Sequence, residues 1–243
     1  MSSKGGVVAV TCLALEARIA RGPGVSVLCM QTPGLGVALR TAIAQGAAGI
    51  ISFGIAGGLA PDLAAGDWVV ASGVRNRKHS TPIPTDRAWS QRLMDMLPGA
   101  INAGVVGCDV LVPSSEEKFK LYEETGAAAV DMESHIAAAI AAEHRIPFAA
   151  CRVIIDAAQR ALPPAATLGL HLDGTPDVPA VIRSVWQIPG QIPALIRTAI
   201  DYRIAERALR RGRKKLGTGL AFPYYKNLSV ELGLRVTSPS FTG

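Results

Sequence analysis

The chain is poor in aromatic side chains, and it lacks any uninterrupted apolar run of 18 residues. Phe, Trp and Tyr make up 5% of its 243 residues, although hydrophobic residues together make up 49%. The missing long run argues against a membrane-spanning helix, and the ample apolar fraction excludes a chain without a core. The core must therefore be built from Ala, Val, Ile and Leu, and the length suits one large α/β domain.

Cysteine and histidine are equally scarce, with four residues of each. No two cysteines have CxxC spacing, and the histidines show no ligand spacing on a common face. The sequence therefore predicts no metal site and no cofactor. Buried, reduced thiols of a cytoplasmic protein are the simplest interpretation of the cysteines, which are Cys12, Cys29, Cys108 and Cys151.

The amino-terminal apolar run indicates a first strand rather than a signal peptide, because it alternates and then meets Glu16 and Arg18 instead of a small-residue cleavage site. Up to residue 160, short β-branched runs alternate with Ala-rich helical runs. This alternation predicts a three-layer α/β/α fold with a central mixed sheet. Strands are expected over 7–13, 25–33, 50–58, 67–75, 101–112 and 147–158, and helices over 36–46 and 116–126. Residues 129–145 are expected to form a strand that runs into an Ala-rich helix.

The amino-acid composition changes after residue 161, where prolines divide the chain into short segments. We expect a main domain over 1–180, a basic amphipathic helical extension over 181–215, and a Gly/Ser/Thr-rich tail over 216–243. The formal charge of +6 lies entirely in 197–215, which hold eight basic and two acidic residues. The other 224 residues are neutral overall, so the basic character belongs to one segment.

Residues 192–215 combine helical apolar spacing with this charge, which suits peripheral contact with an anionic membrane. A helix docked on the domain with a charged tip is the alternative. Nucleic acid is not expected as a partner, because the segment has no interleaved aromatic platform.

Three short motifs carry chemistry. The first, GIAGGLAPDLAAGD, places Gly57 and Gly58 after a strand, where backbone can approach a ligand, although such glycines also form ordinary turns. In the second, AVDMES, Glu133 can accept both hydroxyl hydrogens of a ribose, or it can merely favour a helix start. The third, ACRVIID, ends a buried strand in Asp156, which is a costly place for an acid unless it handles a proton or pairs with a cation such as Arg152.

Together these motifs resemble the purine nucleoside phosphorylase/nucleosidase superfamily, most closely its methylthioadenosine/S-adenosylhomocysteine nucleosidase branch. The resemblance covers roughly residues 6–160. The opening CLALEARIARG, the form VDMESH and the trailing WQIPGQIPALIRTAIDYRIAERALRR look like the hopanoid-associated nucleosidase/phosphorylase family. That resemblance implies removal of adenine from adenosylhopane, whose 5′ carbon carries a pentacyclic lipid, and a homodimer.

The resemblance also implies roles for single residues. Asp156 is matched to the acid that protonates the leaving purine, and Glu16 to the acid that activates water. The substrate-binding positions are matched to Glu133 and Met132 for the ribose, to the backbone of Leu111 and Val112 for the adenine edge, and to Ile55, Gly57 and Gly58 in the glycine loop.

The glycine loop departs from the phosphate-using relatives, because Ser52 and Ile55 stand where those proteins place Arg and Ser. An isoleucine side chain cannot bind phosphate, so hydrolysis is favoured over phosphorolysis. Phosphate remains a possible co-substrate if Arg40 or Arg75 supplies a site from elsewhere. Two other interpretations stay open, namely a methylthioadenosine/S-adenosylhomocysteine nucleosidase and an inactive nucleoside- or lipid-binding module. The location implied is cytoplasmic, with peripheral contact at the membrane's inner face.

Overall fold

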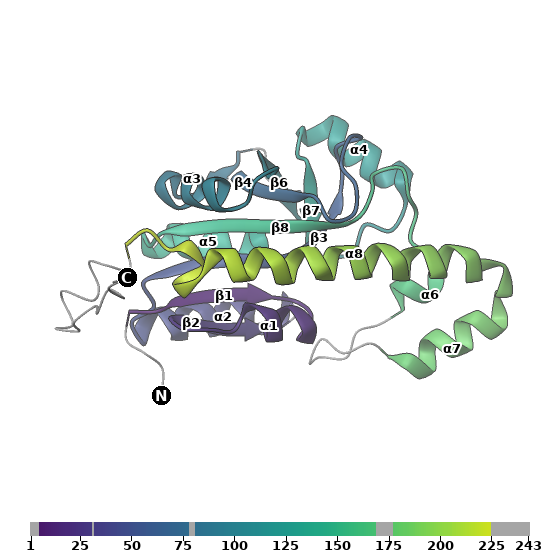
Figure 1. Cartoon of the computed structure of the whole chain (residues 1–243), viewed down its shortest axis with the longest axis horizontal. Helices are drawn as coiled ribbons and strands as arrows, with labels where there is room; N and C mark the ends of the chain where they lie inside the picture. Colours follow the sequence, from purple (N-terminus) through teal and green to yellow (C-terminus); the bar gives the residue numbers. More distant parts are fainter. Residues whose placement is uncertain (1–4, 31, 78–80, 169–176, 225–243) are drawn as a thin grey trace, which may run out of the picture.

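The computed structural model describes residues 5–30, 32–77, 81–168 and 177–224 (Figure 1). Its strands are β1 (Val7–Thr11), β2 (Val25–Cys29), β3 (Gly49–Gly58), β4 (Trp68–Asn76), β5 (Ile83–Pro84), β6 (Ile101–Gly107), β7 (Ala129–Asp131) and β8 (Phe148–Asp156). Its α-helices are α1 (Ala14–Ala20), α2 (Thr32–Ala44), α3 (Arg87–Met96), α4 (Ser115–Thr125), α5 (Ser134–His144), α6 (Pro164–Thr167), α7 (Val178–Gln187) and α8 (Ile192–Leu216). Short 3-10 turns cover Pro189–Gln191 and Thr218–Ala221.

All these strands form one mixed sheet. The order is β2-β1-β3-β7-β6-β4-β5, and β8 pairs in parallel with β3 and antiparallel with β4. The strands β3, β7, β6, β4 and β8 therefore close a circuit, while β1 and β2 extend the sheet beyond β3. The predicted fold class is confirmed.

Side chains alternate between two hydrophobic cores on the opposite faces of the sheet. On β1, Val7 and Ala9 face the first core, and Val8 and Val10 face the second. Helices α1, α3 and α8 cover the first core, and α2 and α5 cover the second, which accounts for the three layers. A third, smaller cluster lies under α4.

Three helices, α1, α3 and the single turn α6, are absent from the sequence-based prediction. The start of α3 is fixed by Asp86, whose carboxylate accepts a hydrogen bond from the amide of Trp89 over 2.8 Å. The strand expected over 101–112 is too long, since β6 ends at Gly107. Its partner β7 ends at Asp131, which is paired with Gly107, so the following residues have no neighbouring strand and form a loop.

The C-terminal half of α8 belongs to the first core. Ala205, Ala208, Leu209 and Leu216 are buried there, and Phe222 packs edge-on against Trp89 at 4.8 Å between ring centroids. The expected boundary at residue 180 therefore does not separate two hydrophobic cores. Part of the expected tail, 217–224, is packed on the domain, and residues 225–243 lie outside the described residues. Within the described ranges, no helix is both long and apolar enough to cross a bilayer.

Candidate functional site

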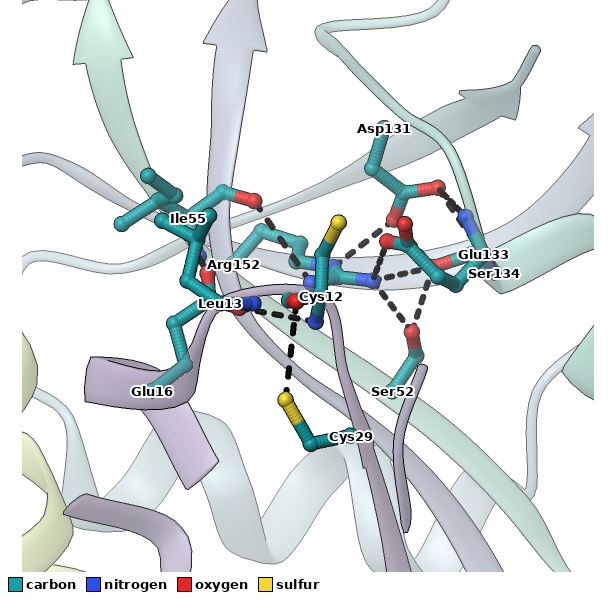
Figure 2. A network of polar contacts seen from close by, with 10 residues as sticks. All are labelled: Cys12, Leu13, Glu16, Cys29, Ser52, Ile55, Asp131, Glu133, Ser134 and Arg152. Atoms are coloured by element: carbon teal, nitrogen blue, oxygen red, sulfur yellow. Dashed lines mark hydrogen bonds and ion pairs between the residues drawn. The ribbon is translucent and has the colours of Figure 1, made fainter. Parts of the chain in front are cut away.

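A cluster of buried polar side chains surrounds the second half of β3 (Figure 2). Four parts of the chain contribute to it: the turn from β1 into α1, the strand β8, the turn from β7 into α5, and the helix α4. Because β7 runs antiparallel to β3, it carries Asp131 back along β3 towards Arg152 on β8. The cluster is thus a product of the mixed sheet.

Glu16 is held by three backbone amides and is only 2% exposed. Its Oε2 accepts hydrogen bonds from Cys12 and Leu13 over 2.9 and 2.8 Å, and its Oε1 accepts one from Ile55 over 2.7 Å. Burial raises the pKa of Glu16, and Arg152 and these amides oppose the rise. A fixed carboxylate with a raised pKa suits a general base.

Arg152 is the central cation of the cluster and is fully buried. Its Nε lies 2.7 Å from Oδ2 of Asp131, and its Nη2 lies 3.5 Å from Oε2 of Glu133. Its Nη2 also donates to the hydroxyl of Ser52. The expected interpretation of Arg152 as an ion-pair partner therefore holds, but its partners are Asp131 and Glu133 rather than Asp156.

The cluster contains more acid than base. Glu16, Asp131 and Glu133 are all buried around one guanidinium, so full ionisation would leave an excess of negative charge out of water. Burial raises the pKa of Glu133 to about 7. The neighbouring carboxyl groups of Asp131 and Glu16 add to the rise, and Arg152 opposes it. Oε1 of Glu133 is buried and has no hydrogen-bond partner among the described residues. Such an orphaned acceptor indicates a position that a hydroxyl donor of a ligand can fill.

The turn from β7 into α5 fixes Glu133 locally. The carboxylate of Asp131 accepts hydrogen bonds from the amides of Glu133 and Ser134 over 3.3 and 3.0 Å. The hydroxyl of Ser134 donates to Asp131 and is hydrogen-bonded to the hydroxyl of Ser52 over 2.9 Å, which ties the start of α5 to β3. Asp131 therefore acts as both a helix cap and a partner of Arg152, while Met132, between these residues, is half-buried.

Asp156 does not stand alone at the end of β8, because it forms a buried ion pair with Lys118 of α4. Lys118 also donates to the carbonyl oxygens of Ala157 and Arg160 over 3.2 and 3.0 Å, so all three of its hydrogens are used. Burial raises the pKa of Asp156, and Lys118 opposes the rise. Asp156 is thus a held carboxyl group whose pKa is raised by burial against the opposing charge of Lys118.

Three glycines of β3 give these groups their space. A Cβ at Gly54 would lie 2.4 Å from Oε1 of Glu16 and 2.9 Å from Nη1 of Arg152. A Cβ at Gly57 would lie 3.6 Å from Oδ1 of Asp156, and one at Gly58 would lie 3.0 Å from the carbonyl oxygen of Asp156. In this structure the absent side chains make room for the protein's own catalytic candidates.

The remaining predicted positions lie around the cluster. The amide of Ile55 holds Glu16. Leu111 is exposed, whereas Val112 is buried in the cluster under α4. Arg40 is paired with Glu143 over 2.7 Å near the far end of α5, about 15 Å along that helix from Glu133. The expectation that Arg40 supplies a phosphate site is therefore wrong.

The thiols do not form a second reactive centre. Burial raises the pKa of Cys12 and Cys151, and it raises that of Cys108 to about 11. Thiolate chemistry is disfavoured at these three residues. Among the described residues, no group of three or more His, Cys, Asp or Glu is arranged to hold a metal ion.

Sequence reasoning missed Lys118, Asp131, Ser52 and Ser134 as members of the cluster. Lys118 lies in a helix that looks wholly polar, but Leu121, one turn later on the same face, is buried. That spacing places Lys118 inwards and was the available signal. Asp131 had one as well, since an Asp just before a helix often accepts hydrogen bonds from the amides two and three residues later.

Residues 22–173 match the profile of the Phosphorylase superfamily. The chain belongs to that superfamily. No curated protein matches it, so the family assignment rests on this profile.

Solved structures share the fold of this phosphorylase superfamily chain. Futalosine hydrolase of Helicobacter pylori matches with a TM-score of 0.60 and 17% identity, over 75% of this chain and 97% of its own. The 5′-methylthioadenosine/S-adenosylhomocysteine nucleosidase from Helicobacter pylori with butyl-thio-DADMe-Immucillin-A matches with a TM-score of 0.64 and 14% identity, over 88% and 97%. A putative nucleosidase of that kind from Francisella philomiragia matches with a TM-score of 0.58 and 15% identity, over 87% and 96%. Identities this low show the fold alone.

Proposed function

We propose that the chain hydrolyses the N-glycosidic bond of a purine nucleoside, and that its substrate is adenosylhopane, cleaved to adenine and ribosylhopane. One observation carries the proposal. Two buried carboxyl groups lie near neighbouring positions of β3: the amide of Ile55 binds Glu16, and Asp156 is the β8 residue paired in register with Gly57, two residues further along. Two residues of strand span about 7 Å, which leaves room for a ribosyl carbon between an attacking water and a departing base.

The chemistry divides between the two carboxyl groups. As the bond from the ribose C1′ to the purine N9 breaks, its electron pair goes to the base, and a proton reaches N7 from the Asp156 side. A water molecule adds to C1′ and gives its proton to Glu16. Glu133 accepts the ribose hydroxyl hydrogens at Oε1, which has no hydrogen-bond partner among the described residues. The transition state resembles an oxocarbenium ion, which is positively charged. The excess of carboxyl groups over the single guanidinium of Arg152 therefore stabilises it.

Asp156 itself passes the proton to the purine. Burial raises the pKa of this carboxyl group, so it takes up a proton more readily than an aspartate in water, and Lys118 opposes the rise and holds the group in place. Transfer of that proton to N7 leaves an ionised carboxylate beside Lys118, so charge and protons balance.

Water is favoured over phosphate by the charge of the cluster. Three carboxyl groups surround one guanidinium, and the amide of Ile55 already binds Glu16 instead of an anion. A phosphate at this point would face net negative charge, and the amide of Ile55 is not free to bind it. Phosphorolysis to phosphoribosylhopane is therefore the weaker version of the proposal.

The 5′ lipid is supported by the likeness of the sequence to hopanoid-associated nucleosidases and by exposed apolar helices at the C-terminal end. A methylthioadenosine/S-adenosylhomocysteine nucleosidase is the second candidate, favoured by the shared fold. An inactive binding module is disfavoured, because a module that binds without reacting has no use for two buried, opposed carboxyl groups.

The test is adenine release from adenosylhopane and from methylthioadenosine, each with and without phosphate. We expect phosphate-independent release from adenosylhopane that falls 10²–10⁴-fold in Glu16→Gln and in Asp156→Asn. Glu143→Gln, which changes a surface carboxylate on α5, is the matched control and should keep full activity.

Each alternative has its own outcome. Release that requires phosphate would replace hydrolysis by phosphorolysis. Consumption of methylthioadenosine alone would remove the lipid substrate but keep the roles of Glu16 and Asp156. No release from either nucleoside would leave only a binding function.

A further inference from the structure

Exposed apolar side chains gather on the C-terminal helices. Of fifteen large hydrophobic side chains exposed in the described residues, eight lie between residues 178 and 204. We call these eight the apolar face. Trp186 is its most prominent member and is 82% exposed. The apolar face consists of Val178, Ile182, Trp186, Ile188, Ile192, Ile196, Ile200 and Ile204.

The apolar face follows helical spacing, so it is a continuous stripe on each helix. On α7 its members recur every four residues at 178, 182 and 186, and on α8 they do so from 192 to 204. The opposite face of α8 is the one that packs on the domain, through Asp201, Ala205 and Ala208. The stripe on α8 therefore points largely away from its own core. Its last member, Ile204, also contacts the domain, because a Cβ at Gly66 would lie 2.9 Å from Cγ2 of Ile204.

The outward face of α8 changes from isoleucine to cation along its length. At 100° per residue, Arg203, Arg207 and Lys214 project in the same direction as the isoleucine stripe but follow it in the helix. All three are exposed. The acids nearby are already occupied, since Asp201 pairs with Arg160 and Glu206 pairs with Arg210. We call Arg203, Arg207, Arg210, Arg211, Lys214 and Lys215 the basic stretch.

The apolar face lies beside the candidate site. Helix α8 packs along β8, which carries Arg152 and Asp156, and its N-terminal half projects with α7 beyond α1 (Figure 1). Tyr202, in the middle of α8, is close enough to Glu16 that this carboxylate, after burial, helps to raise the tyrosine pKa to about 12. One helix therefore borders the site and presents the apolar face.

We propose that the apolar face and the basic stretch dock on an anionic lipid bilayer. The isoleucines and Trp186 enter the headgroup boundary, and the basic stretch contacts lipid phosphates. Docking does not depend on the reaction. Its use to bring a lipid nucleoside to Glu16 and Asp156 rests on the proposed function.

Charge favours a bilayer over a second copy of this chain. An isologous contact through this surface places the basic stretch against its own copy or against the apolar face. Of the six cations, Arg210 is already paired with Glu206, and neither surface offers carboxylates to the other five. Anionic lipid offers phosphate to those five and hydrocarbon to the isoleucines.

Trp186 provides the measurement. Trp89 is fully buried and Trp68 is half-buried, so a shift in tryptophan emission on adding vesicles reports Trp186. With vesicles of phosphatidylglycerol and phosphatidylcholine, we expect a blue shift and co-sedimentation that weaken at least tenfold from 50 to 500 mM salt. Trp186→Phe should lose the shift but still co-sediment.

Paired variants separate the two components. Ile196→Ser with Ile200→Ser, and Arg203→Glu with Arg207→Glu, should each weaken partitioning at least tenfold. Phe119→Ser, at a side chain 64% exposed on α4, and Arg87→Glu with Arg92→Glu on α3 are the matched controls and should partition like the wild type.

Three results would overturn docking. The first is equal vesicle partitioning of the wild type and all variants, and the second is affinity for pure phosphatidylcholine vesicles equal to that for the anionic vesicles at every salt concentration. The third is a wild-type chain that does not bind vesicles but forms a dimer, which dissociates in the isoleucine variant. Cleavage of nucleosides is scored separately in detergent. Vesicle binding without cleavage would refute the proposed function and keep the docking surface, while cleavage without vesicle binding would do the reverse.

Discussion

Buried charge shapes this molecule at the scale of single residues. Arg152 and Lys118 are both fully buried, and each is matched to carboxyl groups that are themselves almost fully covered. Burying such groups costs free energy that their mutual attraction seldom exceeds. Residues with this arrangement contribute more to chemistry than to stability, and the two clusters should differ in how they respond to pH and to substitution.

Glu133→Gln should stabilise the protein at alkaline pH. Because the folded-state pKa of Glu133, about 7, lies above its ordinary value, the folded chain binds more protons than the unfolded chain between about pH 4.5 and 7. Its contribution to the free energy of unfolding is therefore present at low pH and is lost as pH rises through that window. Urea unfolding should show the variant more stable than wild type by roughly 1–3 kcal/mol at pH 8 and little changed at pH 5. An equal difference at both pH values would contradict this.

Lys118→Met should be strongly destabilising, by about 3–5 kcal/mol in urea unfolding at pH 7, because it strands Asp156 as an unpaired buried acid. The double variant Lys118→Met/Asp156→Leu should recover most of that loss while remaining inactive. A double variant as unstable as the single one would mean that Lys118 acts through its bonds to Ala157 and Arg160 instead.

At the scale of elements, β3 organises the site. It pairs with β1, β7 and β8, and its glycines admit the side chains that those neighbours bring. Its backbone at Ile55 also holds Glu16. A change in this strand should alter chemistry before it alters folding.

Gly54→Ala tests that role. The added Cβ would overlap Oε1 of Glu16 and displace Arg152, so adenine release should fall at least tenfold while the chain still folds. Gly190→Ala is the matched control, since a Cβ there meets no atom within 4 Å. Full activity in Gly54→Ala would show that the position of Glu16 is not critical.

Sequence patterns predicted the structure best in strands whose successive side chains alternate between the two hydrophobic cores. The alternation in VVAV and CRVIID identified β1 and β8, and the motif order located Glu133 and Asp156 at strand ends. Patterns failed in α4, where Phe119 is exposed and Lys118 is buried, the reverse of their hydropathies. The spacing from Lys118 to Leu121 indicates the inward face, but the partner that makes burial of a lysine possible is Asp156, 38 positions away, which no local pattern identifies.

At the scale of the whole molecule, the two opposite faces of α8 have different roles. Its inner face completes the first core, and its outer face carries the apolar face and the basic stretch. The segment proposed to bind membrane therefore cannot be deleted without also removing part of the first hydrophobic core.

A chain ending at Gly190 should fail to fold, because it removes Ala205, Ala208, Leu209 and Leu216 from the first core. A chain ending at Tyr224 keeps every described core side chain and should unfold cooperatively, like the full chain. Thermal unfolding followed by circular dichroism separates the two. A cooperative transition in the shorter chain would contradict this account.

The late position of α8 also has a consequence for synthesis. Ile19, Ile51 and Phe53 share a core with Leu220 and Phe222, which the ribosome adds about 170 residues after Phe53. At 5–20 residues per second, that surface stays uncovered for about 10–30 s. Throughout that interval the nascent chain presents a ready surface for chaperones, and any pause in translation prolongs it.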